Sequence, residues 1–204
     1  MKKLFLASSF KDAAGIFEQF AGDVKGKRVT FIPTASVVEK VVFYVKSGRK
    51  ALEKMGLIID ELEISKAAPE EIAEKLTKND YVYISGGNTF FLLQELKRTG
   101  TDKIIADQVN GGKLYIGESA GAMVASPDIE YAGAMDSVKK APKLKGFDAL
   151  ALTDFYTVPH HTNAPFKKAV EKIIAQYGNS LTLYPISNKK AVLVSGDKVT
   201  VAEA

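Results

Sequence analysis

Ser119 stands in the sequence Gly-Glu-Ser-Ala-Gly, residues 117–121, after an apolar stretch and before a run of small residues. This G-x-S-x-G pattern is typical of a nucleophilic serine held on a sharp turn between a strand and a helix. The N–H group of Ala120, directly after the serine, points toward the same space and is placed to stabilise an oxyanion. The alternative is a serine that only forms a compact turn, so a nucleophilic role needs further partners.

Histidine is the partner that such a serine needs, because its hydroxyl requires a base to become a nucleophile at neutral pH. The chain has 2 histidines, His160 and His161, which are adjacent in Val-Pro-His-His-Thr-Asn. Both follow an expected strand that ends at Val158. Adjacent residues near a strand end point to opposite sides, so one of the two is expected to face the site.

An acidic residue would orient the imidazole and stabilise the imidazolium that forms during catalysis. Spacing alone does not choose among the acids that lie between the serine and the histidines. These candidates are Asp128, Glu130, Asp136, Asp148 and Asp154.

A second oxyanion donor is expected from a loop at the end of a neighbouring strand. The segment Ser-Gly-Gly-Asn, residues 85–88, fits this role. Gly86 and Gly87 allow the backbone to approach a substrate closely, and Asn88 can cap the helix that follows. The alternative is an ordinary Gly-Gly turn followed by a helix cap.

Strands and helices alternate along the chain in a way that would bring these segments together. The expected strands are residues 3–8, 28–36, 57–65, 81–87 and 113–117, and the expected helices are residues 13–24, 38–56, 68–79, 88–100, 101–112 and a helix that begins within 119–126. This order predicts an α/β fold with a mostly parallel sheet covered on both faces. Residues 191–204 predict a C-terminal β-hairpin that turns at Gly196-Asp197. Sites in such sheets lie beyond the carboxyl ends of the strands, which directs attention to the segments FIPTAS, YISGGN, YIGESAG and TVPHHTN.

The composition favours one globular domain, residues 1–204, because 204 residues with 46% hydrophobic content can bury a substantial core. The absence of cysteine excludes disulfides, thiolate metal sites and cysteine nucleophiles. The net charge of +4 is mild, and the basic segment 139–145 has no interleaved aromatic residues, so no nucleic-acid partner is expected. No apolar run approaches the roughly 18 residues that span a membrane, and a cytoplasmic protein is expected.

Neither a metal nor a cofactor is expected. Two adjacent histidines cannot easily bind one ion together, and the chain has no H-E-x-x-H spacing. Walker and G-x-G-x-x-G patterns are also absent, which weakens a nucleotide-binding interpretation. No feature of the sequence indicates an oligomeric state.

Four motifs in order, YISGGNTFFLL, LYIGESAGAMVAS, GFDAL and PHHTN, resemble peptidase family S51, which contains dipeptidase E (α-aspartyl dipeptidase) and its cyanophycinase relatives. The resemblance implies a class I glutamine-amidotransferase-like, flavodoxin-like three-layer sandwich and a serine peptidase that hydrolyses small peptides. It implies that Ser119 is the nucleophile, His160 the catalytic histidine, and the N–H groups of Gly87 and Ala120 the oxyanion hole. Gly86, Asn88 and His161 are then the candidate substrate-binding residues.

Two departures from the family's pattern concern the acid and the substrate. The family's acid would fall on Ala134 without a gap, so Asp136 is the expected third member, with Glu130 or a Ser-His dyad as the alternatives. Aspartyl dipeptidases also carry a substrate-binding arginine shortly after the histidine, whereas the last arginine here is Arg98. Aspartyl specificity is therefore doubtful. A weak or inactive family member with a binding or sensing role and a small esterase remain alternatives.

Overall fold

The computed structural model describes all residues, 1–204, and its centre is a seven-stranded sheet with the strand order β3-β2-β4-β5-β1-β8-β9. A second sheet of two parallel strands pairs β6 with β7. The strand bounds are β1 Lys3–Ala7, β2 Arg28–Ile32, β3 Ile58–Glu61, β4 Tyr81–Ile84, β5 Leu114–Glu118, β6 Tyr156–Val158, β7 Leu183–Pro185, β8 Lys190–Ser195 and β9 Lys198–Glu203.

The first five strands of this order are parallel to one another. Strand β8 pairs antiparallel with β1, and β9 pairs antiparallel with β8. The expected hairpin is present, because β8 and β9 pair in antiparallel register and Gly196 adopts a φ of 60° at the turn between them. The sheet is therefore parallel with one antiparallel edge, as the sequence predicts.

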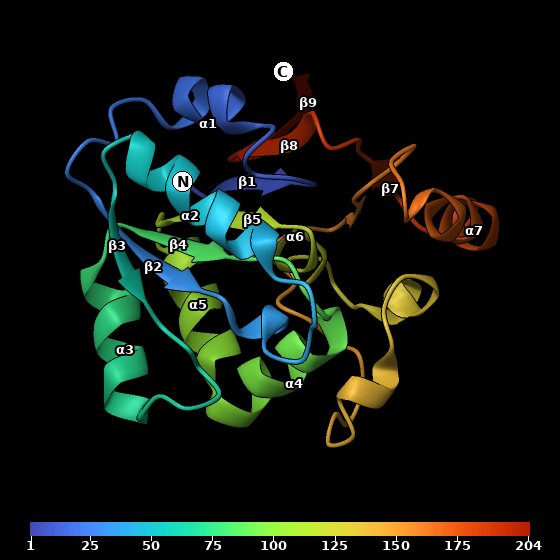
Figure 1. The fold of residues 1–204 in the computed structure, drawn as a ribbon, viewed down its shortest axis with the longest axis horizontal. Helices are drawn as coiled ribbons and strands as arrows, with labels where there is room; N and C mark the ends of the chain where they lie inside the picture. Colours follow the sequence, from blue (N-terminus) through green and yellow to red (C-terminus); the bar gives the residue numbers. More distant parts are fainter.

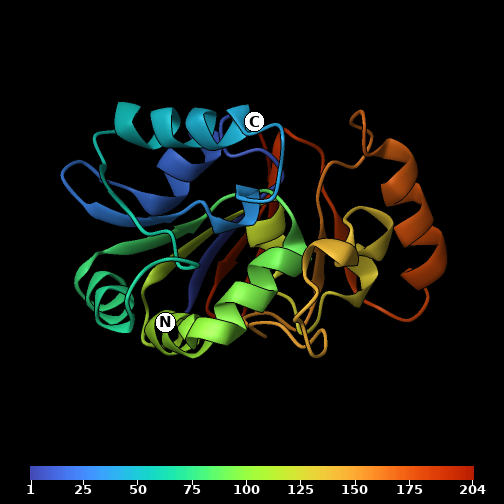
Figure 2. The same ribbon diagram turned by 60° about the horizontal axis from the view of Figure 1, so that its bottom comes forward.

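Helices cover both faces of the large sheet and make the fold a three-layer α/β sandwich. Figures 1 and 2 show α1 and α2 on one face and α3, α4 and α5 on the other. Side chains of β1 alternate between two apolar cores, with Leu4 and Leu6 in the larger one and Phe5 and Ala7 in the smaller one. The helix bounds are α1 Ala14–Ala21, α2 Phe43–Lys54, α3 Pro69–Lys78, α4 Thr89–Thr99, α5 Thr101–Asn110, α6 Ala120–Met123 and α7 Lys167–Tyr177. None of these helices combines the length and hydropathy needed to cross a membrane.

Several elements are shorter than the sequence predicts. Strand β2 ends at Ile32, because Pro33 follows and residues 34–36 form a 3-10 turn. Helix α2 begins at Phe43 rather than near residue 38, and the preceding loop is held by an ion pair of 2.7 Å between Glu39 and Lys140. Val41, which lies within the expected helix 38–56, precedes α2 and is 59% exposed.

Two elements near the carboxyl ends of the parallel strands differ from the sequence-based prediction. Helix α6 has only 4 residues before the chain turns away. Strand β7 was missed because it is only 3 residues long and ends in a proline. It pairs with β6, and Figure 1 shows this pair with α7 beyond the large sheet, on the side where the parallel strands end.

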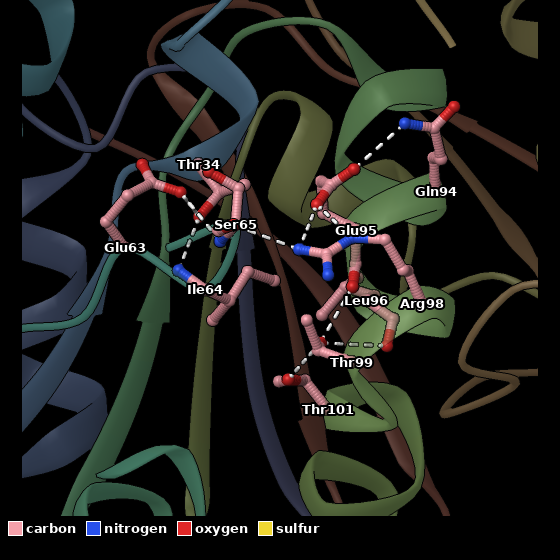
Figure 3. A network of polar contacts seen from close by, with 10 residues as sticks. All are labelled: Thr34, Glu63, Ile64, Ser65, Gln94, Glu95, Leu96, Arg98, Thr99 and Thr101. Carbon is pink, nitrogen blue, oxygen red and sulfur yellow. Dashed lines mark hydrogen bonds and ion pairs between the residues drawn. The ribbon is translucent and has the colours of Figure 1, made fainter. Parts of the chain in front are cut away.

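A polar network fixes α4 against the segment that follows β3 (Figure 3). Arg98 donates through Nε to Glu95 at 2.7 Å and through Nη2 to the carbonyl of Ser65 at 3.0 Å. Gln94 donates to the other oxygen of the Glu95 carboxylate at 2.9 Å. Arg98, the last arginine of the chain, therefore has a structural role in joining α4 to the segment after β3.

Candidate active site

The turn around Ser119 joins β5 directly to α6. Ser119 adopts φ 50° and ψ −108°, a backbone conformation that residues other than glycine rarely adopt. A Cβ on Gly117 would lie 2.5 Å from the carbonyl oxygen of Gly121, and one on Gly121 would lie 2.2 Å from that of Ile84. The close packing of the turn therefore requires both glycines of the motif. The positive φ of Ser119 means that the turn also holds backbone strain at the serine.

His160 reaches Ser119 from the loop that follows β6. Its Nε2 lies 2.9 Å from Ser119 Oγ, and its own φ of 62° is also positive. The ring of Phe166 stacks on the imidazole with centroids 4.8 Å apart. Burial lowers the pKa of His160 below its ordinary value of 6.5, against the opposing effect of a hydrogen bond to Asn188. The imidazole is thus neutral at neutral pH, the form that can accept a proton from the serine.

The other side of the imidazole contacts Asn188 and Ser8. Nδ1 lies 2.9 Å from Asn188 Oδ1 and 3.1 Å from Ser8 Oγ. Ser8 Oγ accepts the backbone N–H of His160 at 2.7 Å and donates its hydrogen to Asn188 Oδ1 at 2.9 Å. The single hydroxyl hydrogen of Ser8 is already donated to Asn188, so it is not available to Nδ1 of His160. Nδ1 is therefore the protonated nitrogen and donates to Asn188 Oδ1. This tautomer leaves the Nε2 lone pair directed at Ser119.

The acids expected from the sequence do not reach His160. Asp136 accepts two hydrogen bonds from Thr89, one from its backbone N–H at 2.9 Å and one from its hydroxyl at 2.5 Å. Burial raises the pKa of this carboxyl. Glu130 is exposed at the start of a 3-10 turn, and Asp128 bonds to the hydroxyl of Tyr156 at 2.7 Å. The imidazole partner in this structure is therefore an amide.

Sequence reasoning missed Asn188 for two reasons. The search covered only acids and only the stretch between the serine and the histidines, whereas Asn188 follows both. Its signal in the sequence is its place three residues after the end of β7, in the segment Pro-Ile-Ser-Asn, residues 185–188. Its backbone N–H donates to Asn163 Oδ1 at 2.9 Å, which fixes the loop that presents it.

The Gly-Gly loop lies against the serine, as expected for a site at the strand ends. A Cβ on Gly86 would lie 3.2 Å from Ser119 Cβ and 3.5 Å from the ring of Tyr44. Gly87 has a φ of 140°, and a Cβ there would lie 2.2 Å from the backbone of Ala35. The N–H of Gly87 donates to no backbone carbonyl. The N–H of Ala120 begins α6, where helices lack internal partners.

The two remaining candidates differ in their freedom to bind a substrate. Asn88 caps α4 by accepting from Phe91 N–H at 2.9 Å and donates to the carbonyl of Ser137 at 3.2 Å. It is 1% exposed, so its polar atoms are already used inside the protein. His161 donates its backbone N–H to Ile186 at 2.9 Å, and its partly exposed ring makes no hydrogen bond.

None of the three arginines lies at this site. Arg28 begins β2, at the end of the parallel sheet opposite Ser119. Arg49 pairs with Glu53 and Glu61, and Arg98 with Glu95. Lys167 and Lys168 are exposed at the start of α7. The structure also holds no group of three or more His, Asp or Glu side chains placed to bind a metal ion.

Comparison with known proteins matches residues 4–202 to the profile of Peptidase family S51. The chain is 57% identical to uncharacterized peptidase Lin0382 of Listeria innocua over 98% of this chain and 95% of that one. It is 55% identical to uncharacterized peptidase PM1590 of Pasteurella multocida over 97% and 95%. Peptidase E of Salmonella arizonae is 38% identical over 71% of this chain and 60% of that one.

Solved structures show the same fold. The crystal structure of a Listeria monocytogenes EGD-e protein assigned to peptidase E superposes with a TM-score of 0.97 at 54% identity, over 100% of this chain and 99% of that one. A peptidase from an acI-B1 actinobacterium superposes with a TM-score of 0.75 at 21% identity, over 100% and 88%, which concerns the fold alone. The three-layer α/β arrangement expected from the sequence is confirmed.

Proposed function

Because the chain belongs to peptidase family S51, we propose that it is a serine-type peptidase that hydrolyses small peptides by acyl transfer through Ser119. The observation that carries this proposal is the 2.9 Å contact between Ser119 Oγ and His160 Nε2 at a strained strand-to-helix turn. A nucleophile within hydrogen-bond reach of an oriented base is the arrangement that activates a serine.

The geometry supports the following steps. His160 Nε2 accepts the Ser119 hydroxyl proton as Oγ attacks the peptide carbonyl carbon. The N–H groups of Gly87 and Ala120 stabilise the resulting oxyanion. Collapse breaks the C–N bond, and His160 gives its proton to the leaving amine, which leaves an acyl ester on Ser119. Water then attacks this ester with His160 again as base, which releases the acid and restores the serine.

Asn188 orients the imidazole but brings no negative charge to it. A neutral amide holds the correct tautomer, as in the Cys-His-Asn arrangement of papain-like proteases. It stabilises the imidazolium less than a carboxylate would, so we expect slower turnover than with an acidic third member. The same observation favours the second candidate, a family member that binds peptides with little or no turnover.

We propose that the substrate does not carry an aspartyl side chain at the position read by aspartyl dipeptidases. All three arginines are placed or paired elsewhere, and no lysine or arginine is hydrogen-bonded to Ser119 or His160. The rings of Tyr44 and Phe166 instead flank Gly86 and His160. These rings favour apolar substrate side chains over carboxylates.

The experiment that tests the proposal is hydrolysis of a dipeptide library that includes Asp-X and apolar X-X members. We expect turnover of apolar dipeptides that His160→Ala abolishes, while Lys172→Ala, at an exposed position of α7, retains it as the control. Hydrolysis of p-nitrophenyl esters without any peptide hydrolysis would support a small esterase instead. Binding of dipeptides without turnover would support the second candidate, and preferred hydrolysis of Asp-X would contradict the substrate proposal.

A further inference from the structure

Glu118 is a buried carboxyl group directly before Ser119, and the steps above give it no task. It is 4% exposed and ends β5 on the face of the sheet that carries α2. No basic side chain pairs with it. Its surroundings are instead a set of hydrogen-bond donors from separate segments, which is an unusual environment for a group placed only to fill the core.

Two hydrogen-bond donors converge on this carboxyl group. Oε1 accepts the backbone N–H of Phe10 at 2.8 Å, and Oε2 accepts the hydroxyl of Tyr83 at 2.6 Å. The nearby backbone of Gly86 also favours the charged form, since it lowers the pKa of the carboxyl group. Both hydrogen bonds are stronger when the carboxyl group is ionised, because a charged acceptor binds a donor more strongly than a neutral one.

Phe10 and Gly86, the two backbone segments next to this carboxyl group, each belong to a loop of the active site. Phe10 lies two residues after Ser8, which holds the backbone and Nδ1 side of His160. Gly86 packs on the Cβ of Ser119 and precedes Gly87, the proposed oxyanion donor. One side chain therefore connects the loop that positions the base with the loop that positions the oxyanion hole.

Helix α2 covers the Glu118 carboxyl group and the Tyr83 hydroxyl. A Cβ on Gly48 would lie 2.3 Å from Tyr83 Oη and 3.3 Å from Glu118 Oε2, so the helix packs directly on the pair. Tyr44, one turn earlier in α2, lies against Gly86. The helix thereby shields the carboxyl group from water, and its hydrogen-bond donors are Phe10 N–H and the Tyr83 hydroxyl.

We propose that Glu118, in its ionised form, is a positioning residue that holds the Ser8–Phe10 loop and the Gly86–Gly87 loop in register around Ser119 and His160. This inference rests on the proposed function, since it concerns the same site. It predicts that the site is well formed only when the carboxyl group has lost its proton.

Protonation of Glu118 falls within the working range of a peptidase. Burial raises its pKa to about 7, although the hydrogen bonds from Tyr83 and Phe10 and the nearby backbone of Gly86 oppose this rise. The titratable groups that face it are Tyr83 on β4, Asp12 after β1 and Tyr44 on α2, none of them basic. The proposed activity should therefore fall as pH decreases through about 7.

The test measures the rate at which a fluorophosphonate probe labels the full-length protein between pH 5 and pH 9 at constant ionic strength. In Glu118→Gln the rate at high pH should fall roughly tenfold, because the loops lose their common anchor. The midpoint of the acidic limb should move below 6.5, toward the imidazole value. In Tyr83→Phe the midpoint should rise by about one unit, because one stabilising hydrogen bond to the charged form is lost.

The opposite shifts separate positioning by an ionised carboxylate from a purely structural role. Tyr131→Phe is the matched control, since it removes another buried hydroxyl, one that donates to Thr157. It should lower the melting temperature and leave the midpoint unchanged. Tyr83→Phe alone tests the proposal if Glu118→Gln does not fold. Midpoints that stay at the wild-type value in both variants would overturn the role of Glu118, while wild-type protein that is not labelled at Ser119 would overturn the proposed function and this role with it.

Discussion

His160 has a neutral partner on the side of its ring that faces away from Ser119. Asn188 Oδ1 accepts from Nδ1, and the hydroxyl of Ser8 donates to the same oxygen. The pair fixes the tautomer without adding charge, so the pKa of His160 is governed by burial and lies below 6.5. The base therefore stays neutral and available, at the cost of weaker stabilisation of its protonated form.

Replacing Asn188 should separate orientation from charge. Asn188→Ala removes the acceptor for Nδ1–H, and the rate of fluorophosphonate labelling should fall by on the order of 100-fold or more. Asn188→Asp keeps the acceptor and adds a negative charge, so the pKa of His160 should rise. Nuclear magnetic resonance of the imidazole hydrogens measures this shift. An unchanged His160 titration in Asn188→Asp would contradict the observed contact.

Asp136 offers a parallel test of which residue supports the base. Asp136→Asn keeps an acceptor oxygen for Thr89 and removes only the charge. Labelling of Ser119 should stay close to the wild-type rate, whereas loss of a true triad carboxylate lowers catalysis by about 10⁴-fold. A drop of that size in Asp136→Asn would restore Asp136 as the third catalytic member.

At the scale of elements, the sequence predicts the sheet better than the loops that build the site. Apolar runs of β4 and β5 and the alternation with helices indicate a parallel sheet, and the Gly-Asp turn indicates the hairpin. The predicted start of α2 was wrong because residues 38–42 lie in a loop, where Val41 is 59% exposed rather than packed against the sheet. Strand β7 was missed because 3 residues carry too little periodicity.

The turn between β5 and α6 should be intolerant of any added side chain. In Gly121→Ala the new Cβ would lie 2.2 Å from the carbonyl of Ile84, a backbone atom that cannot move aside. We expect a loss of about 2 kcal/mol or more in the free energy of unfolding. Gly133→Ala is the control, because nothing lies within 4 Å of its Cβ position. Equal stability of the two variants in chemical denaturation would show that the turn relaxes easily.

At the scale of the whole molecule, the ionisation of Glu118 links stability to pH. Burial raises its pKa from 4.5 to about 7, so folding favours the protonated form. The stability that this group contributes is complete below pH 4.5 and is lost as pH rises through 7. Glu118→Gln lacks this dependence. Its free energy of unfolding should therefore gain about 3 kcal/mol relative to wild type between pH 4 and pH 8.

Urea denaturation of both proteins at the two pH values measures this difference. A constant difference between them would show that the carboxyl group does not titrate in this range. The expected result would mean that the proposed working form of the protein is the less stable one.

The sequence predicts those parts of the site that directly follow strands. Ser119 and Gly86 follow β5 and β4, and the large parallel sheet brings their loops to one edge, while His160 follows β6 of the two-stranded sheet. Ser8 and Asn188 follow two further strands and were not predicted. Serine and asparagine are common residues, and only their contacts in the folded chain show that they bond to His160. Which side chain faces the imidazole depends on the packing of the whole chain.

The central claim is that Ser119 is a nucleophile activated by His160, and covalent labelling tests it most directly. Intact-protein mass spectrometry after incubation with a fluorophosphonate, followed by peptide mapping, should show one adduct, located on Ser119. Ser119→Ala should carry none, and His160→Ala should react far more slowly, while Lys172→Ala, at an exposed position of α7, reacts like wild type. An adduct of equal yield in Ser119→Ala, or labelling that does not depend on His160, would contradict the account.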